Sequence, residues 1–358
     1  MAASLNDQKM ILARTEKEFG SSHPRVADVL KNLAVLYEEN GQLEQAEQLV
    51  ERVVDIRERN FGLEHSEVAS ALNHLAVIRE NMEAFDDVEP LLIRALAIRQ
   101  KALGAEHPLV ASTLLNLGVL YEATGDYEQA EMHYQQTLTL REKALGPKHH
   151  DVADSINRLA LLYEETGNFQ KAEPLLLRLL KLDEETLGKD HPNVGTTLNN
   201  LAILYEEKGD YGRAELLYQR VLEIREKSAD TNGQALADAL HNLAELYNET
   251  GDFELAEPLY LKSLEIKEDM LGEENQVVVN LINYLGMFYL ENEELKKSEV
   301  LLKRAVKLRE QTLGGDHPDV ADALYDLADL YKVMGDSYRA KEVFDRAVQI
   351  HEKTLEEQ

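Results

Sequence analysis

The chain has 358 residues and no cysteine, and its 38 Lys and Arg stand against 67 Asp and Glu, which gives a formal net charge of −29. The absence of cysteine excludes a disulfide framework, a thiolate metal site and a cysteine nucleophile. Nucleic acids and anionic membrane surfaces attract Lys- and Arg-rich patches, so this acidic balance makes both poor partners.

The N-terminal stretch MAASLNDQKMILARTEKEF contains no long apolar run and therefore does not resemble a secretory signal. No part of the chain approaches the roughly 18 apolar residues of a membrane-spanning helix. We therefore expect a cytoplasmic protein without membrane insertion. Residues 4–19 align with the second helix of the repeat that follows, and we expect them to form a capping half-repeat helix at the N-terminal end.

From residue 20 to residue 358 the sequence repeats with a period of 42 residues. One slot holds glycine in six copies and glutamate in two: Gly41, Glu83, Gly125, Gly167, Gly209, Gly251, Glu293 and Gly335. A Leu-Ala or Leu-Gly pair recurs with this slot, from Leu33-Ala34 to Leu327-Ala328. A strict period of this length indicates a continuous array of stacked units rather than separate globular domains.

Residues 192–227 show how one repeat is expected to fold. The apolar residues of its first half follow one face of a helix: Val194, Leu198, Leu201 and Tyr205. Pro192 suits the first turn of this helix and Gly209 its end. Asp210 fits the N-cap of a second helix. Each repeat is therefore predicted to be a helical hairpin, and residues 20–358 to hold eight of them in one continuous solenoid.

Leu33, Ala34, Tyr37, Gly41 and Ala46, with their copies, are similar to the tetratricopeptide repeat consensus. The 42-residue length and the recurring LYEE, GD-Y, AE and LGxxHP elements resemble more narrowly the repeat of kinesin light chains and nephrocystin-3. The resemblance implies an all-α, right-handed superhelical solenoid whose first helices line a concave groove. It also implies a scaffold or adaptor that binds other proteins. Kinesin light chains carry a heptad coiled coil before their repeats, and this sequence has no sustained heptad there.

An aliphatic stripe is expected along that groove. A helical wheel of the first helix places one side chain opposite the buried side, and this position is apolar in five copies: Val35, Val77, Val119, Leu161 and Ile203. In the last three copies the position holds Glu245, Met287 and Asp329. An exposed apolar stripe flanked by polar residues indicates an interaction surface.

Asparagines accompany the stripe, at Asn32, Asn73, Asn116, Asn157, Asn199, Asn200, Asn242 and Asn283. A side-chain amide offers donors and an acceptor, so it can bind the backbone of an extended peptide whatever the peptide's sequence. The alternative is that these amides bond only to the neighbouring helix. The cations expected in the groove are Lys31 and Arg158, with His74 and His241 as further candidates.

Acidic side chains outnumber these cations. They are Asp28, Asp154, Asp238, Glu245, Asp322, Asp326 and Asp329, with Glu38, Glu80, Glu122, Glu164 and Glu206 on the rim. Kinesin light chains recognise acidic tryptophan-containing motifs with a basic groove, which this sequence does not offer. We therefore expect a neutral, apolar or mildly basic peptide, extended or as a short helix, bound mainly by the first five repeats.

Further side chains recur where hairpins meet and on the second helices. Tyrosine recurs at Tyr37, Tyr121, Tyr163, Tyr205, Tyr247, Tyr289 and Tyr331, with Arg79 in the remaining early copy. Arginine recurs at Arg52, Arg94, Arg178, Arg220, Arg304 and Arg346. The tyrosines are expected to fill space between hairpins. The arginines, interleaved with glutamates, predict i,i+4 pairs on a solvated face.

One histidine recurs in the turn before most first helices, at His23, His65, His107, His149, His191 and His317. Successive copies are expected about 10 Å or more apart, whereas zinc ligands lie about 2 Å from the metal. We therefore expect a structural role in the turn and no metal or other cofactor. The sequence has no phosphate-binding loop, nucleophile elbow or zinc-protease helix, so we expect no enzymatic activity.

Two alternative functions remain open. The first is a purely architectural or oligomerising scaffold, because no polar capping helix follows the last repeat. Val343, Phe344 and Val348 are then expected to be partly exposed, and self-association through the terminal helices becomes an option. The second is a regulatory arm of an enzyme on another chain.

Overall fold

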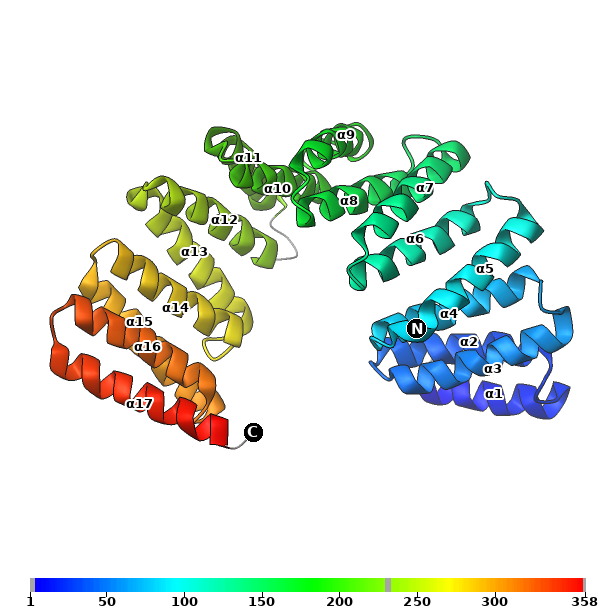
Figure 1. Cartoon of the computed structure of the whole chain (residues 1–358), viewed down its shortest axis with the longest axis horizontal. Helices are drawn as coiled ribbons and strands as arrows, with labels where there is room; N and C mark the ends of the chain where they lie inside the picture. Colours follow the sequence, from blue (N-terminus) through cyan, green and yellow to red (C-terminus); the bar gives the residue numbers. More distant parts are fainter. Residues whose placement is uncertain (1–3, 229–232, 357–358) are drawn as a thin grey trace. The chain divides into compact units, whose positions relative to one another are not determined.

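The computed structural model describes residues 4–228 and 233–356. Within them the chain forms 17 α-helices and one short 3₁₀ helix, with no strand (Figure 1). None of these helices is long and apolar enough to cross a lipid bilayer. The contacts group the chain into two compact units, unit 1 (Met1–Thr186) and unit 2 (Leu187–Gln358), and each is described by itself.

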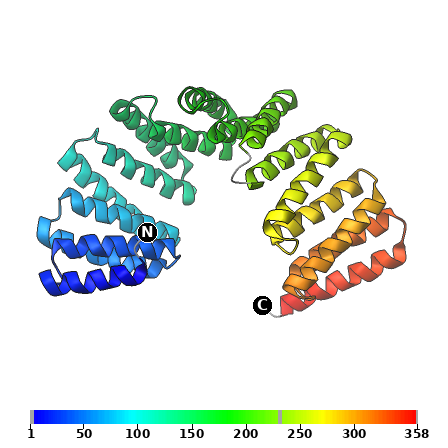
Figure 2. The same cartoon turned by 180° about the vertical axis from the view of Figure 1, so that it is seen from behind.

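Unit 1 begins with α1 (Leu5–Phe19) and continues with helices that alternate between the first and second members of each repeat. Its first helices are α2 (Pro24–Glu39), α4 (Ser66–Asn81), α6 (Pro108–Ala123) and α8 (His150–Glu165). Its second helices are α3 (Leu43–Phe61), α5 (Val88–Leu103), α7 (Tyr127–Leu145) and α9 (Phe169–Leu187), with η1 (Phe85–Asp87) before α5. Helix α2 packs on α3, α4 on α5 and α6 on α7, and the same helices are seen from behind in Figure 2.

Unit 2 repeats this order. Its first helices are α10 (Pro192–Glu207), α12 (Gly233–Thr250), α14 (Gln276–Glu291) and α16 (Pro318–Val333). Its second helices are α11 (Tyr211–Lys227), α13 (Phe253–Leu271), α15 (Leu295–Leu313) and α17 (Ser337–Glu356). Each first helix packs on the second helix that follows it, and each hairpin packs on the next. The core is built from the apolar faces read from the sequence; Val194, Leu198 and Leu201, for example, are fully buried.

The repeated glycine slot is a turn with left-handed backbone. Gly125 has φ 79° and Gly335 has φ 75°, a region that costs L-residues energy but not glycine. Glu83 (φ 58°) and Glu293 (φ 60°) adopt the same conformation without glycine's freedom. The slot therefore keeps its backbone shape even where the sequence departs from glycine.

The recurring histidine is a helix N-cap, which confirms its predicted structural role. In the turns before α2, α4, α6, α8, α10 and α16, its Nδ1 accepts the backbone N–H two residues later at 3.1–3.2 Å. Asn275 replaces it before α14, and its Oδ1 accepts the Val277 N–H at 2.9 Å. The side chain satisfies one of the unpaired N–H groups at the start of a helix.

The recurring tyrosine ties neighbouring hairpins together. In five copies its hydroxyl donates to a glutamate 32 residues earlier, on the second helix of the preceding hairpin, at 2.6–3.2 Å. Arg79 stands in the tyrosine position of α4 and bonds through Nε to Glu47, also 32 residues earlier, at 2.7 Å. The substitution therefore keeps the partner and replaces a hydrogen bond with an ion pair.

The pairing predicted for the second-helix arginines is wrong. Arg94 bonds to Glu58 at 2.7 Å and Arg304 to Glu268 at 2.8 Å, in each case 36 residues back on the preceding second helix. Arg52, Arg178 and Arg346 pair in the same way with Glu16, Glu142 and Glu310. These ion pairs therefore join each second helix to the second helix of the preceding repeat.

The last helix, α17, keeps part of its apolar surface exposed. Phe344 is 40% and Tyr338 79% exposed, while Val343 and Val348 are half-buried. The predicted partial exposure is therefore confirmed. The Phe344 ring packs edge-on against Tyr325, which limits how much of it faces solvent.

Candidate peptide-binding faces

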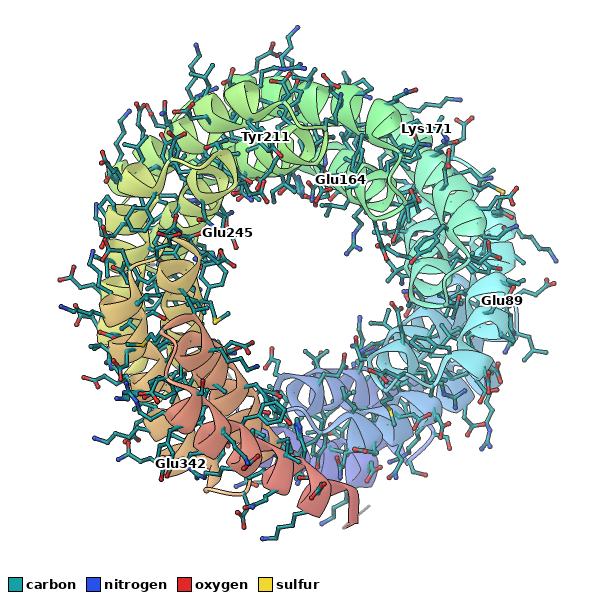
Figure 3. All side chains as sticks on the ribbon, turned by 60° about the vertical axis from the view of Figure 1, so that its left-hand side comes forward. Glu89, Glu164, Lys171, Tyr211, Glu245 and Glu342 are labelled. Carbon is teal, nitrogen blue, oxygen red and sulfur yellow. The ribbon has the colours of Figure 1, made fainter. Side chains whose placement is uncertain are left out.

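The aliphatic stripe lies on the face formed by the first helices, here called the first-helix face of each unit. In unit 1, Val35 is 39% and Leu161 41% exposed, and Val77 and Val119 are half-buried. In unit 2, Ile203 is 41% exposed. The stripe is accessible, as a binding role requires. Figure 3 shows Glu164 on this side of unit 1, and Glu89 and Lys171, from second helices, on the other side.

The asparagines fall into two columns that differ by one position in the repeat. The first column holds Asn73, Asn157, Asn199 and Asn283, and the second holds Asn32, Asn116, Asn200 and Asn242. A bond can therefore run from one first helix to a residue 43 positions later on the next. The sequence prediction named both columns as one set, although adjacent positions lie about 100° apart around a helix axis.

Some of these amides bond to the neighbouring hairpin. The Asn242 Nδ2 donates to Asn199 Oδ1 at 2.9 Å, and the Asn283 Nδ2 donates to Asp326 Oδ2 at 2.6 Å. The Oδ1 atoms of Asn73 and Asn283 are buried and accept no hydrogen bond from the described residues. Asn32 is exposed. The amides thus combine inter-helix bonding with unused acceptor capacity.

The candidate cations of the first-helix faces occupy different environments. Lys31 and Arg158 are exposed, whereas the His74 Nε2 lies 2.7 Å from Glu38 Oε1. Burial raises the pKa of Glu80, the positive charge of Arg158 opposes this rise and the negative charge of Glu122 adds to it. The His241 ring packs edge-on against Tyr260 and Tyr284.

The glutamate column of unit 1 is partly buried at the C-terminal end of each first helix. Glu122 accepts a hydrogen bond from the Tyr134 hydroxyl, which lies on α7. One repeat later, Leu176 stands where Tyr134 would be, so Glu164 has no hydroxyl partner. Its Oε1 is buried without a hydrogen bond, and burial raises the pKa of Glu164 to about 7.

One group of potential metal ligands comes together in the part of the chain that the structure describes. Ligand atoms of His149, His150 and Asp151 lie within 4.8 Å of one another. The Nδ1 of His149 already accepts the Asp151 backbone N–H at 3.2 Å as the cap of α8. The cap explains the position of the first histidine, and His150 is simply the first residue of the helix.

The sequence matches the family model described as Tetratricopeptide repeat over residues 1–59, 67–143, 116–184, 151–227, 217–269 and 277–353. The chain belongs to the tetratricopeptide repeat family. Its fold is an all-α repeat solenoid. None of the curated proteins matches the sequence.

Solved structures of other tetratricopeptide repeat proteins are similar to this one. A Podosopora anserina putative kinesin light chain with nearly identical repeats is 28% identical, with a TM-score of 0.54 over 58% of this chain and 99% of that chain. BtubC (BKLC) from P. vanneervenii is 24% identical, with a TM-score of 0.56 over 64% and 92%. A Pyrococcus horikoshii signal transduction ATPase with a tetratricopeptide repeat sensor is 18% identical, with a TM-score of 0.64 over 93% and 50%. The resemblance to kinesin light chain-like repeats is therefore confirmed.

Proposed function

We propose that this tetratricopeptide repeat protein is a non-enzymatic scaffold or adaptor whose first-helix faces bind a segment of a partner protein. The observation that carries the proposal is the exposed aliphatic stripe opposite the core, with Val35, Leu161 and Ile203 about two-fifths accessible. Burying apolar surface of this kind contributes about 25 cal/mol per Å². Its repetition along the first helices suits a ligand that extends over several repeats.

The amides beside the stripe supply the polar part of the recognition. The exposed amide of Asn32 and the half-buried amide of Asn116 can pair with backbone N–H and C=O groups of an extended or short helical peptide. The glutamate column of unit 1 disfavours acidic ligands, because like charges at close range repel. The ligand we propose is therefore neutral, apolar or mildly basic.

A peptide array tests this proposal. Bound peptides are remeasured on a Val119→Ser/Asn157→Ala double variant, and the matched control is Ile93→Ser, an exposed aliphatic residue (50%) on the second helix α5. We expect the double variant to lose about tenfold or more in affinity, which is about 1.4 kcal/mol, and the control to bind normally. The proposal is wrong if acidic peptides bind best or if the double variant binds like the native protein.

An architectural role is the second candidate, and the exposed Tyr338 and Phe344 on α17 favour it. Self-association through this helix would bury them. Sedimentation of the native chain and of a Phe344→Ser variant tests the idea. Assembly that persists in the double variant above and disappears in Phe344→Ser would favour the architectural role.

A further inference from the structure

Unit 2 has a pocket on its first-helix face that the aliphatic stripe does not account for. It has a volume of about 310 Å³ and lies between α10, α12 and α14. Its carboxylates and rings are Glu206, Glu245, Glu249, Glu291, Tyr284 and Phe288. Figure 3 shows Glu245 on the first-helix side of this unit.

The aromatic part of the pocket is held firmly in place. Phe288 is only 2% exposed and packs edge-on against Tyr260, with ring centroids 5.0 Å apart. The hydroxyls of Tyr284 and Tyr260 lie 3.0 Å apart, and their rings are also edge-on. Tyr284 therefore presents a fixed ring, and the faces of such rings attract cations.

The four carboxylates of the pocket have polar neighbours of two kinds, a tyrosine hydroxyl and a histidine ring. Glu206 accepts a hydrogen bond from the Tyr218 hydroxyl at 2.6 Å, and Glu245 lies 3.3 Å from the His241 Nε2. Among the described residues, no lysine or arginine pairs with any of the four. Burial raises the pKa of Glu206 even though the Tyr218 hydrogen bond lowers it, and the charges of Glu249 and Glu245 raise it further.

The equivalent place in unit 1 contains an arginine. Helices α4, α6 and α8 correspond to α10, α12 and α14 at a distance of three repeats, and Arg158 occupies the position of Tyr284. Its charge lowers the pKa of Glu80, the counterpart of Glu206, against the effect of burial. Burial and the hydrogen bond to Glu122 raise the pKa of the Tyr134 hydroxyl, the counterpart of Tyr260, and the charge of Arg158 opposes that rise.

Unit 2 thus lacks the cation and has more negative charge. The counterparts of Glu245 and Glu249 in unit 1 are Val119 and Ala123, which are uncharged. Where the chain places its own guanidinium among carboxylates in unit 1, it leaves a pocket in unit 2. The sequence difference at these three positions therefore replaces an arginine whose charge acts on Glu80 with an open acidic site.

We propose that this pocket binds one arginine side chain of a partner peptide, with the guanidinium against Tyr284 and between the carboxylates of Glu206 and Glu245. The inference rests on the proposed function, since it names one residue of the peptide that the first-helix faces bind. Arginine fits better than lysine because its planar guanidinium stacks on aromatic rings and bonds carboxylates through two N–H groups. The remaining carboxylates attract the same charge over a longer range.

Met287 lines the pocket and reports on it directly. The chain has seven methionines, so methyl-labelled methionine gives a simple NMR spectrum in which a Met287→Leu variant identifies the signal. The probes are blocked arginine, Nα-acetyl-arginine methylamide, and its uncharged citrulline analogue. We expect the Met287 methyl signal to shift with the arginine probe and not with the citrulline probe. Equal shifts with both probes would overturn the proposal.

Variants sharpen this test. Tyr284→Arg places a guanidinium of the chain itself at the position that Arg158 has in unit 1. We expect this variant to abolish the response to the arginine probe. Glu249→Gln, at an exposed position, is expected to weaken binding at least threefold and serves if Tyr284→Arg does not fold. Glu265→Gln, an exposed change on the second helix α13, is the matched control and should bind normally. A native-like response from Tyr284→Arg, or from Glu249→Gln in its place, contradicts the proposal.

The pocket and the wider proposed function can fail separately. Array peptides whose binding depends on Val119 and Asn157, but not on arginine or Tyr284, would refute the arginine pocket and leave the peptide-binding scaffold standing. The opposite result is a Met287 shift that requires arginine in a protein that binds no peptide through Val119 and Asn157. It would support the arginine pocket and refute peptide binding by the aliphatic stripe.

Discussion

Replacing Glu164 with glutamine should stabilise the protein above neutral pH. The Glu164 carboxyl is partly buried, its Oε1 has no hydrogen-bond partner, and burial raises its pKa to about 7 from the usual 4.5. The folded protein therefore binds this proton more tightly than the unfolded chain does. Because proton binding and folding are linked, the free energy of unfolding must fall as pH rises from about 4.5 to about 7. Above that range the buried carboxylate is charged and destabilises the fold by the full amount.

The size of the effect follows from the same pKa values. One pKa unit corresponds to about 1.4 kcal/mol, so the rise in pKa sets a ceiling of about 3 kcal/mol. Glu164 is only partly buried, and its side chain can turn toward water, so we expect a gain of about 1–2 kcal/mol for Glu164→Gln near pH 8. Near pH 5 the gain should shrink to less than half of this value, because the native carboxyl is then mostly protonated.

Urea unfolding followed by far-UV circular dichroism measures both values. The matched control is Glu39→Gln, an exposed glutamate near the end of the first helix α2. We expect the control to change the free energy of unfolding by less than about 0.5 kcal/mol at either pH. Equal gains for Glu164→Gln at both pH values, or an equal gain in the control, would refute the role assigned to burial of the charged carboxylate.

Three further changes test the repeat architecture by the same unfolding assay. His107→Ala removes an N-cap and should cost about 1 kcal/mol, whereas His107→Asn should be nearly neutral, because Asn275 caps α14 in the same way; an equal loss in both variants would contradict the cap. Glu293→Gly places glycine in a left-handed backbone conformation and should raise the free energy of unfolding by about 0.5–1 kcal/mol. Gly125→Ala should lower it by a similar amount. A lower stability of Glu293→Gly would contradict backbone strain at Glu293. Arg79→Ala should lower the free energy of unfolding by about 1–2 kcal/mol, because it leaves the partly buried Glu47 unpaired. Arg79→Tyr should recover most of this loss, because tyrosine bonds to the equivalent glutamate in the other repeats. If Arg79→Tyr recovers nothing, Arg79 does not play the role of the recurring tyrosine.

Local backbone chemistry made the repeat readable from the sequence. Glycine at positions such as Gly125 marks a left-handed turn, and His107 followed by Pro108 marks the start of a helix. Leucines and alanines at helical spacing mark the buried face of each first helix. These signals act within a few residues of one another, so they specify helices, turns and the exposed stripe without any knowledge of the neighbours.

The partners of polar side chains depended on the packing of one hairpin against the next. Arg304 has glutamates within its own helix, yet it bonds to Glu268, 36 residues earlier. The hydrogen bond from Asn242 to Asn199 likewise runs between neighbouring first helices and is not specified by either helix alone. A helical wheel gives the direction of a side chain from its own axis and contains no information about the phase of the adjacent helix.

The repeat pattern by itself determined that the chain is an array of helical hairpins and which residues face outward from the first helices. Only the tertiary structure decided that Tyr284, Phe288 and four glutamates from three helices enclose a pocket. These residues look like scattered departures from the repeat when read along the chain. They form one site because stacking brings residues about 40 positions apart into contact, and the shape and charge of that contact belong to several helices together.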